Sequence, residues 1–103
     1  INGKLQAPTI VDKSLDYKLS MMDLLNDGDY IGIRDLVCNN IDGDEWTELY
    51  RFLYDYIHDV GKFKDQKKWK AAIIVIGDHL FRHTSVADPE INFVQMIIKL
   101  TEI

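Results

Sequence analysis

The sequence has 103 residues, enough for one domain with one hydrophobic core and too few for two. Hydrophobic residues make up 47% of the chain and charged residues 28%, a balance that excludes a disordered tail. Because the net charge is −5, the field of the whole domain repels phosphate backbones, and we expect no direct contact with nucleic acid. A long apolar run and a signal-peptide pattern are both missing, so we expect no membrane partner and no secretion.

The single cysteine indicates a cellular compartment, and the first residues indicate where the folded domain begins. Cys38 has no second cysteine with which to form an internal disulfide, which suits the reducing cytoplasm. The sequence starts at Ile1 and not at methionine, as expected for a chain that lost a tag or for a piece of a longer protein. Residues 1–12 contain Gly3 and Pro8 and show no helical period. We therefore predict a lead-in over residues 1–12 and one helical domain over residues 13–103.

Two helices are predicted in the first half of the chain. Ser14 can cap a helix whose apolar residues recur at spacings of three and four, namely Leu15, Leu19, Met22 and Leu25. Gly28 is suited to end this helix in the left-handed conformation. Asp29 then caps a shorter helix with the sequence YIGIRDLVCNN.

Three further helices are predicted in the second half. One runs from Glu45 to about Val60 and carries a broad apolar stripe. Asp65 caps the next, QKKWKAAIIVIGDHLFRHT, and Asp88-Pro89 opens the last, EINFVQMIIKLTEI, with proline at its preferred first position. Composition alone would allow a buried strand over residues 71–76, but apolar residues continue beyond it at helical spacing. The sequence therefore predicts an all-α fold, a five-helix bundle.

The last two predicted helices each carry apolar residues on two faces, more than a terminal helix of one small bundle needs. The fourth can be explained by a central position among the other helices. For the fifth we favour contact on both sides, with the core on one and another chain on the other, because four exposed large apolar side chains mark a partner site. The candidate subunit-interface residues are Phe93, Met96, Ile97 and Leu100, followed by Ile74, Val75 and Phe81.

Metal and calcium sites are weakly supported by the sequence. His79 and His83 are spaced to share one helix face, which suits zinc, but no pair of cysteines or placed third histidine completes a ligand set. Two glycine-containing acidic turns resemble calcium loops, yet the twelfth position is Arg34 in one and Leu49 in the other, where a bidentate carboxylate is required. We predict no metal and no cofactor, and interpret the histidines as an interfacial or partly buried pair.

Catalytic patterns are also missing from the sequence. The carboxylates are scattered, and there is no nucleophile elbow, phosphate-cradling glycine loop or Cys/His pairing. The lysines at positions 62, 64, 67, 68 and 70 fit a solvated helix start that could steer an acidic partner. We expect a non-catalytic domain.

Two segments of the sequence resemble one known family. MMDLLNDGDYIGIRDLV is similar to the opening helix pair of the C-terminal collar domain of sliding-clamp loader subunits, of the replication factor C small-subunit type and its phage relatives. In that pair a glycine, an acidic residue and an aromatic residue separate two helices, and the second helix carries a central basic residue, here Arg34. IIVIGDHLFRHTSVADPEINFVQMIIKL resembles the closing pair, in which an Ile-Gly-acidic stretch leads to a large apolar residue and arginine, here Phe81-Arg82. The resemblance covers about residues 14–103 in order and spacing.

The resemblance implies a collar that packs beside neighbouring clamp-loader subunits in a five-membered ring and holds ATPase (AAA+) modules together in DNA replication. It implies a cytoplasmic location, in the host if the chain is phage-encoded, and the aromatic-rich third helix fits the phage members better. Family subunits carry an ATPase domain and a lid ahead of the collar. This sequence has no GxxxxGK[ST] motif and no Walker-type acidic strand, so ATP hydrolysis does not carry over to it.

A second interpretation is an acidic helical binding protein, of the inhibitor or immunity type, that neutralises a basic partner. Such a protein would gather exposed tyrosine and carboxylate side chains, for example Tyr54, Asp55 and Asp59 on the third predicted helix. A small metalloenzyme that uses His79 and His83 is a third, weaker alternative.

Overall fold

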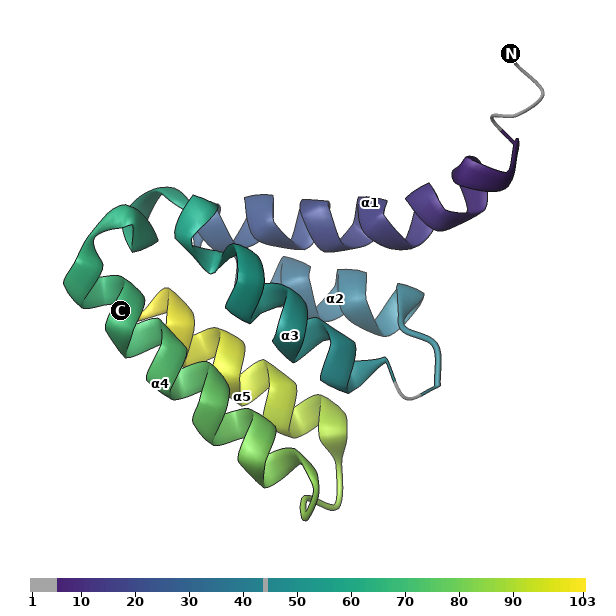
Figure 1. Ribbon diagram of the computed structural model, residues 1–103. Helices are drawn as coiled ribbons and strands as arrows, with labels where there is room; N and C mark the ends of the chain where they lie inside the picture. The colour runs from purple at the N-terminus through teal and green to yellow at the C-terminus, as the bar shows by residue number, and fades with distance from the viewer. Residues whose placement is uncertain (1–5, 44) are drawn as a thin grey trace.

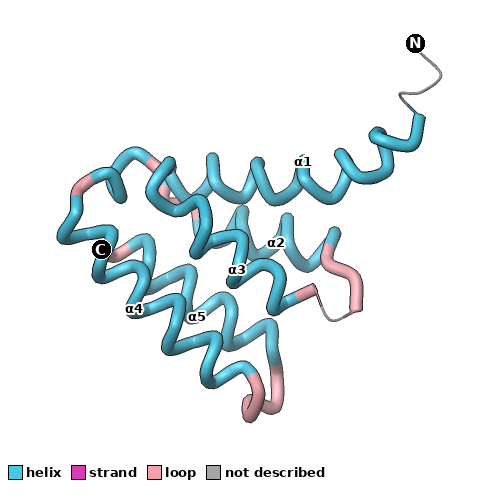
Figure 2. The backbone as a smooth tube through the Cα atoms, in the orientation of Figure 1, coloured by secondary structure: helices cyan, strands magenta, loops and turns pink. Residues whose placement is uncertain are grey.

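The computed structural model describes residues 6–43 and 45–103, with side chains from residue 15 onward. In these residues five α-helices follow one another without a β-strand, which confirms the predicted all-α five-helix bundle (Figure 1). The helices are α1 (Gln6–Asp27), α2 (Tyr30–Asn40), α3 (Trp46–Tyr56), α4 (Gln66–His83) and α5 (Pro89–Thr101). Short loops connect the helices of each neighbouring pair except α3 and α4, whose connection is itself largely helical (Figure 2).

The helices form two hairpins with α3 between them in the chain. α1 packs on α2, and α4 packs on α5. α3 packs on α4, and α2 on α5, so that the two hairpins share one core. α1 lies at one side of the molecule and α4 at the opposite side (Figure 1).

α1 begins earlier than predicted. Its first residue is Gln6, whereas the sequence placed a cap at Ser14. Pro8 is compatible with this start because the first turn of a helix has no intrahelical acceptor for its N–H groups. Residues 6–12 of the predicted lead-in are therefore helical, and residues 1–5 lie outside the described part. The first turns of α1 extend past the end of α2 (Figure 1).

The predicted helix boundaries hold where a specific residue stops or caps the helix. Gly28 has φ of +74°, the left-handed conformation that glycine adopts at low cost, and it separates α1 from α2. Asp29, Asp65 and Asp88 each accept a hydrogen bond from a backbone N–H in the first turn of their helices, at 2.9, 3.1 and 2.9 Å. These caps explain why α2, α4 and α5 begin as the sequence predicts.

The third helix ends sooner than its apolar stripe. α3 stops at Tyr56, and the chain continues as two short 3-10 helices, η2 (Ile57–Asp59) and η3 (Gly61–Lys64). Between them Val60 adopts an extended backbone with ψ of 131°. This break turns the chain so that both Ile57 and Phe63 are buried, which one continuous helix would not achieve. The predicted end at Val60 was wrong for that reason.

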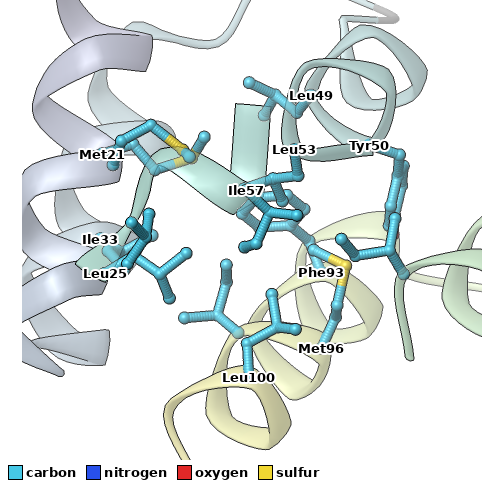
Figure 3. Close-up of a cluster of buried hydrophobic side chains, with 14 of the residues drawn as sticks. Met21, Leu25, Ile33, Leu49, Tyr50, Leu53, Ile57, Phe93, Met96 and Leu100 are labelled. Carbon is cyan, nitrogen blue, oxygen red and sulfur yellow. The ribbon is translucent and has the colours of Figure 1, made fainter. Parts of the chain in front are cut away.

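One core joins all five helices. Figure 3 shows residues from α1, α2, α3, η2 and α5 converging on it, including Met21, Ile33, Leu53 and Phe93. The Phe93 ring has its centroid 5.7 Å from that of Tyr50, in an edge-to-face contact. Each large apolar side chain buried in this way stabilises the fold by about 1.5–3 kcal/mol.

Candidate protein interface

The two apolar faces of α5 are the reverse of those predicted. The four residues expected to contact another chain, Phe93, Met96, Ile97 and Leu100, are each at most 1% exposed and lie in the chain's own core. The prediction that they form a subunit interface was therefore wrong. Helical periodicity identifies two apolar stripes but does not say which one meets the core. Here the stripe that contains Phe93 is buried because the Phe93 ring packs against the rings of Trp46 and Tyr50 on α3.

The outward face of α5 belongs to a shallow groove beside α2. Ile91 is exposed, while Val94 and Ile98 are half-buried, and these residues line an open depression of about 410 Å³. Arg34 stands at its rim, with Nε 3.7 Å from the Glu90 carboxylate. Both side chains are partly exposed, so the pair links α2 to α5 with a small contribution to stability.

The outer face of α4 carries the most exposed large apolar side chains in the described residues. Ile74 is 71% exposed and Phe81 is 80% exposed, and about two helical turns separate them on one face. Lys67 and Lys70 are also exposed and, at about 100° per residue, lie on the same face. We call these four residues the α4 ridge. Val75, the third predicted contact residue on this helix, is half-buried and packs against the core.

A second groove runs between α1 and α3. It encloses about 560 Å³. Its walls are mainly apolar and include Leu15, Leu19, Met22, Phe52, Tyr56 and Val60. Two carboxylates, Asp23 and Asp59, also line it. We call this feature the α1–α3 groove.

The α1–α3 groove is closed at one end. There the backbone N–H of Gly61 donates a hydrogen bond of 3.1 Å to the Asn26 side-chain oxygen, which links η3 to the end of α1. Leu15 and Leu19 line the other end of the described part of the groove, where they are 42% and 50% exposed, and we call this the open end. The groove therefore has an acidic, closed end and an apolar, open end.

Sequence reasoning missed this groove. The sequence places Leu15, Leu19, Met22 and Leu25 together at helical spacings of three and four. In the structure the core takes the neighbouring stripe, Tyr17, Met21 and Leu25, and leaves the first two leucines beside the groove. The available signal was the width of the apolar arc on α1, which exceeds what one contact with α2 can cover.

A buried polar cluster explains one of the two sequence-predicted histidines. Asn92 donates hydrogen bonds of 2.9 Å to the Tyr50 hydroxyl and of 2.9 Å to the backbone carbonyl of His79. His79 is fully buried and donates from Nδ1 to the Val75 carbonyl at 2.9 Å. Burial raises the pKa of Tyr50, and the hydrogen bond from Asn92 opposes part of that rise. These bonds tie α3, α4 and α5 together and are structural in character.

The histidine pair does not assemble a ligand set in the described residues. His83 contacts the edge of Tyr50, with ring centroids 5.6 Å apart. His79 Nε2 and His83 Nδ1 are both buried and find no hydrogen-bond partner among the residues that the structure describes. Within residues 6–43 and 45–103, no three His, Cys, Asp or Glu side chains come together to hold a metal ion. The pair thus lies against the core beside Tyr50.

The predicted lysine cluster is divided between two places. Lys62 Nζ donates a hydrogen bond of 2.9 Å to the Thr101 carbonyl at the end of α5. Burial and the nearby Lys68 charge lower the pKa of Lys62. Lys67 and Lys70 belong to the α4 ridge. Lys62 is therefore held at the end of α5, while Lys67 and Lys70 face outward from α4.

The acidic binding protein was expected to expose Tyr54, Asp55 and Asp59 together. In the structure Arg51 contacts two of these residues. The Arg51 guanidinium lies 5.3 Å from the centroid of the Tyr54 ring, and its Nε lies 3.2 Å from the Asp55 carboxylate. Asp59 contacts His58 and also lines the α1–α3 groove. The three residues thus do not form a single acidic surface.

In the described part of the chain, none of the helices combines the length and the hydropathy needed to cross a bilayer. Comparison with protein-family models, curated proteins and solved structures found no match. The geometry of the chain and the sequence resemblance are therefore the grounds for assigning a function.

Proposed function

We propose that the chain is a non-catalytic oligomerisation domain, the collar of a sliding-clamp loader subunit that scaffolds a multi-subunit ring in DNA replication. The α4 ridge carries this proposal. Single exposed apolar residues are ordinary, but two large ones on one face of a firmly packed helix support a contact there. The proposed partners are neighbouring subunits in the cytoplasm, with no cofactor and no direct nucleic-acid contact.

The positions that carry the family resemblance support this proposal. The opening segment forms the end of α1, the Gly28 turn and α2, and the closing segment forms the α4–α5 hairpin. Arg34, the basic residue of the opening pair, lies beside Glu90 of the closing pair. Phe81 of the Phe-Arg step is exposed on the α4 ridge, while Arg82 pairs with Asp78 at 3.3 Å along the helix.

The way α4 is held suits a scaffold. Its inner face is fixed in the core by Ala72, Ile76 and His79, all buried. A ridge on such a helix loses little conformational freedom on binding, which lowers the entropic cost of association. Apolar surface buried between neighbouring collars would then fix their positions while domains attached to them remain free to move.

The acidic binding protein is the second candidate function. Its support is the net charge of −5 and the exposed Tyr54. Because Arg51 neutralises part of the surface around Tyr54, we favour the collar.

Self-association tests the proposal. Sedimentation velocity of the chain from about 10 μM to 1 mM should show concentration-dependent assembly, since weak specific contacts fall in this range. Replacing both ridge residues, Ile74→Asp and Phe81→Asp, should give a monomer with unchanged circular dichroism. Ile31→Asp alters an exposed apolar residue on α2 and should assemble like the unmodified chain. A chain that stays monomeric throughout would refute the collar and return the acidic binder to first place.

A further inference from the structure

We infer that the α1–α3 groove of one copy of this chain receives the α4 ridge of a second copy, so that assembly is head-to-tail. This inference rests on the proposed function and specifies its contact. It identifies the occupant of the groove as a particular helix of an identical chain.

The groove has the chemistry to receive an amphipathic helix. Leu19 and Tyr56 stand on opposite walls, about half exposed, and the buried Val60 also lines the groove. From Leu15 to Asn26 the α1 wall is about 16 Å long at 1.5 Å per residue, which is about three turns of a docked helix. Apolar side chains spaced over two turns would fit within it.

The α4 ridge supplies a matching helix. Ile74 and Phe81 lie about 10 Å apart along α4, within the length of the groove. Gly77 lies between them, and a Cβ placed there would meet nothing within 4 Å, so α4 can approach a wall closely at that point. The ridge thus presents two large apolar side chains with a low region between them.

The charges set the direction of docking. Lys67 and Lys70 precede the apolar part of the ridge, and in the described residues neither forms an ion pair. Asp23 and Asp59 lie toward the closed end of the groove. Opposite charges meet only if the start of α4 enters at the closed end and Phe81 reaches the open end near Leu15. The neighbour's α4 would then run antiparallel to α1.

The positions of the two surfaces make this contact head-to-tail. α1 and α4 lie on opposite sides of the molecule (Figure 1), and the groove and the ridge share no residue, so one chain can use both surfaces at the same time. An interface between two different surfaces closes into a ring or continues as an open chain, whereas a contact between two identical surfaces stops at a dimer. A ring scaffold requires the first kind.

Mixing two complementary variants tests the inference. Leu19→Asp damages the groove and leaves the ridge, and Phe81→Asp does the reverse. Each should sediment as a monomer alone, because a head-to-tail contact needs both surfaces. Their equimolar mixture should form a 1:1 dimer that does not grow, since one intact groove and one intact ridge remain. Ile31→Asp serves as the control and should assemble like the unmodified chain.

The other results overturn the inference and can be told apart from failure of the collar itself. If Leu19→Asp assembles normally, the groove is not the acceptor, although the oligomerisation domain stands. If both variants are monomeric and their mixture stays so, an intact groove and an intact ridge on separate chains do not bind each other, and again only the inference fails. A monomeric unmodified chain refutes both proposals.

A charge exchange provides a second test at exposed positions that are not needed for folding. One variant carries Asp23→Lys and Asp59→Lys, and the other carries Lys67→Glu and Lys70→Glu. Each alone should assemble about tenfold more weakly or worse, because like charges face each other. The mixture should recover full assembly, since both pairings become complementary. If the mixture remains weak, the lysines and aspartates do not meet.

Discussion

The side-chain amide of Asn92 lies 2.9 Å from the Tyr50 hydroxyl, and this bond joins α5 to α3 inside the core. The same amide holds the His79 carbonyl of α4. A single polar residue thus connects three helices and sets the rotation of α5. That rotation decides which apolar stripe of α5 is buried.

Removing this amide should destabilise the fold. Asn92→Leu leaves the His79 carbonyl and the Tyr50 hydroxyl without their donor, and we expect a loss of about 1–3 kcal/mol in the free energy of unfolding. Tyr50→Phe removes only one bond and should cost about 1 kcal/mol. Urea denaturation measures both. Equal stability of all three proteins would show that the amide makes no net contribution.

Alanine substitutions should show that Phe93 of α5 lies in the core and that Phe81 of α4 lies on the surface. Phe93→Ala opens a cavity and should cost about 3–5 kcal/mol. Phe81→Ala removes an exposed ring and should change the unfolding free energy by about 0.5 kcal/mol or less. Chemical denaturation of dilute protein checks the pair. If Phe81→Ala cost more stability than Phe93→Ala, the burial of Phe93 and the exposure of Phe81 would both be contradicted.

Alanine at two glycines should act in opposite directions. Gly28 has positive φ, so Gly28→Ala places a Cβ in a strained backbone and should cost about 1–2 kcal/mol. Gly77 lies inside α4 with open space around it, and Gly77→Ala should stabilise the helix by about 0.5–1 kcal/mol. Thermal melts in the Phe81→Asp background exclude effects on assembly. Two changes of the same sign would contradict the helix boundary at Gly28.

Tyr17 should make the fold sensitive to alkaline pH. Burial raises its pKa above the ordinary value of 10.0, and the adjacent Glu45 carboxylate, which accepts its hydroxyl at 3.3 Å, raises it further. Above about pH 10 the unfolded chain loses this proton first, so the unfolded state binds fewer protons and the unfolding free energy falls as pH rises. Below pH 10 this contribution is fully present.

Tyr17→Phe provides the measurement for this pH effect. Urea denaturation at pH 7, 9 and 11 should show a smaller loss of stability at pH 11 for the variant than for the unmodified chain. Tyr54→Phe, at an exposed position, is the matched control and should retain the full loss. Identical profiles for all three proteins would mean that Tyr17 keeps an ordinary pKa.

The boundaries that could be predicted from the sequence are those set by local chemistry. Gly28, Asp29, Asp65 and Asp88 act through their own backbone or through a first-turn N–H, so their effect is visible in a short stretch of sequence. The end of α3 was not visible in this way. The apolar stripe continues through Val60, and only the need to bury Phe63 requires a change of direction.

The candidate site was predictable only in part, for a related reason. Periodicity places Ile74 and Phe81 on one face of α4, and that face is exposed. For α5, two stripes of similar hydrophobicity compete, and the winner depends on Asn92 and on the aromatic side chains of α3, far away in the sequence. The α1–α3 groove depends on the angle between two helices, which neither sequence segment encodes alone.

The opposite placement of groove and ridge has a structural consequence for any assembly built through them. Every open row of chains joined in this way retains a vacant α1–α3 groove at one end and an unused α4 ridge at the other. These two ends are chemically different. A different protein carrying only one of the two surfaces would therefore cap one terminus and never the other, giving the array a defined polarity and a defined last member.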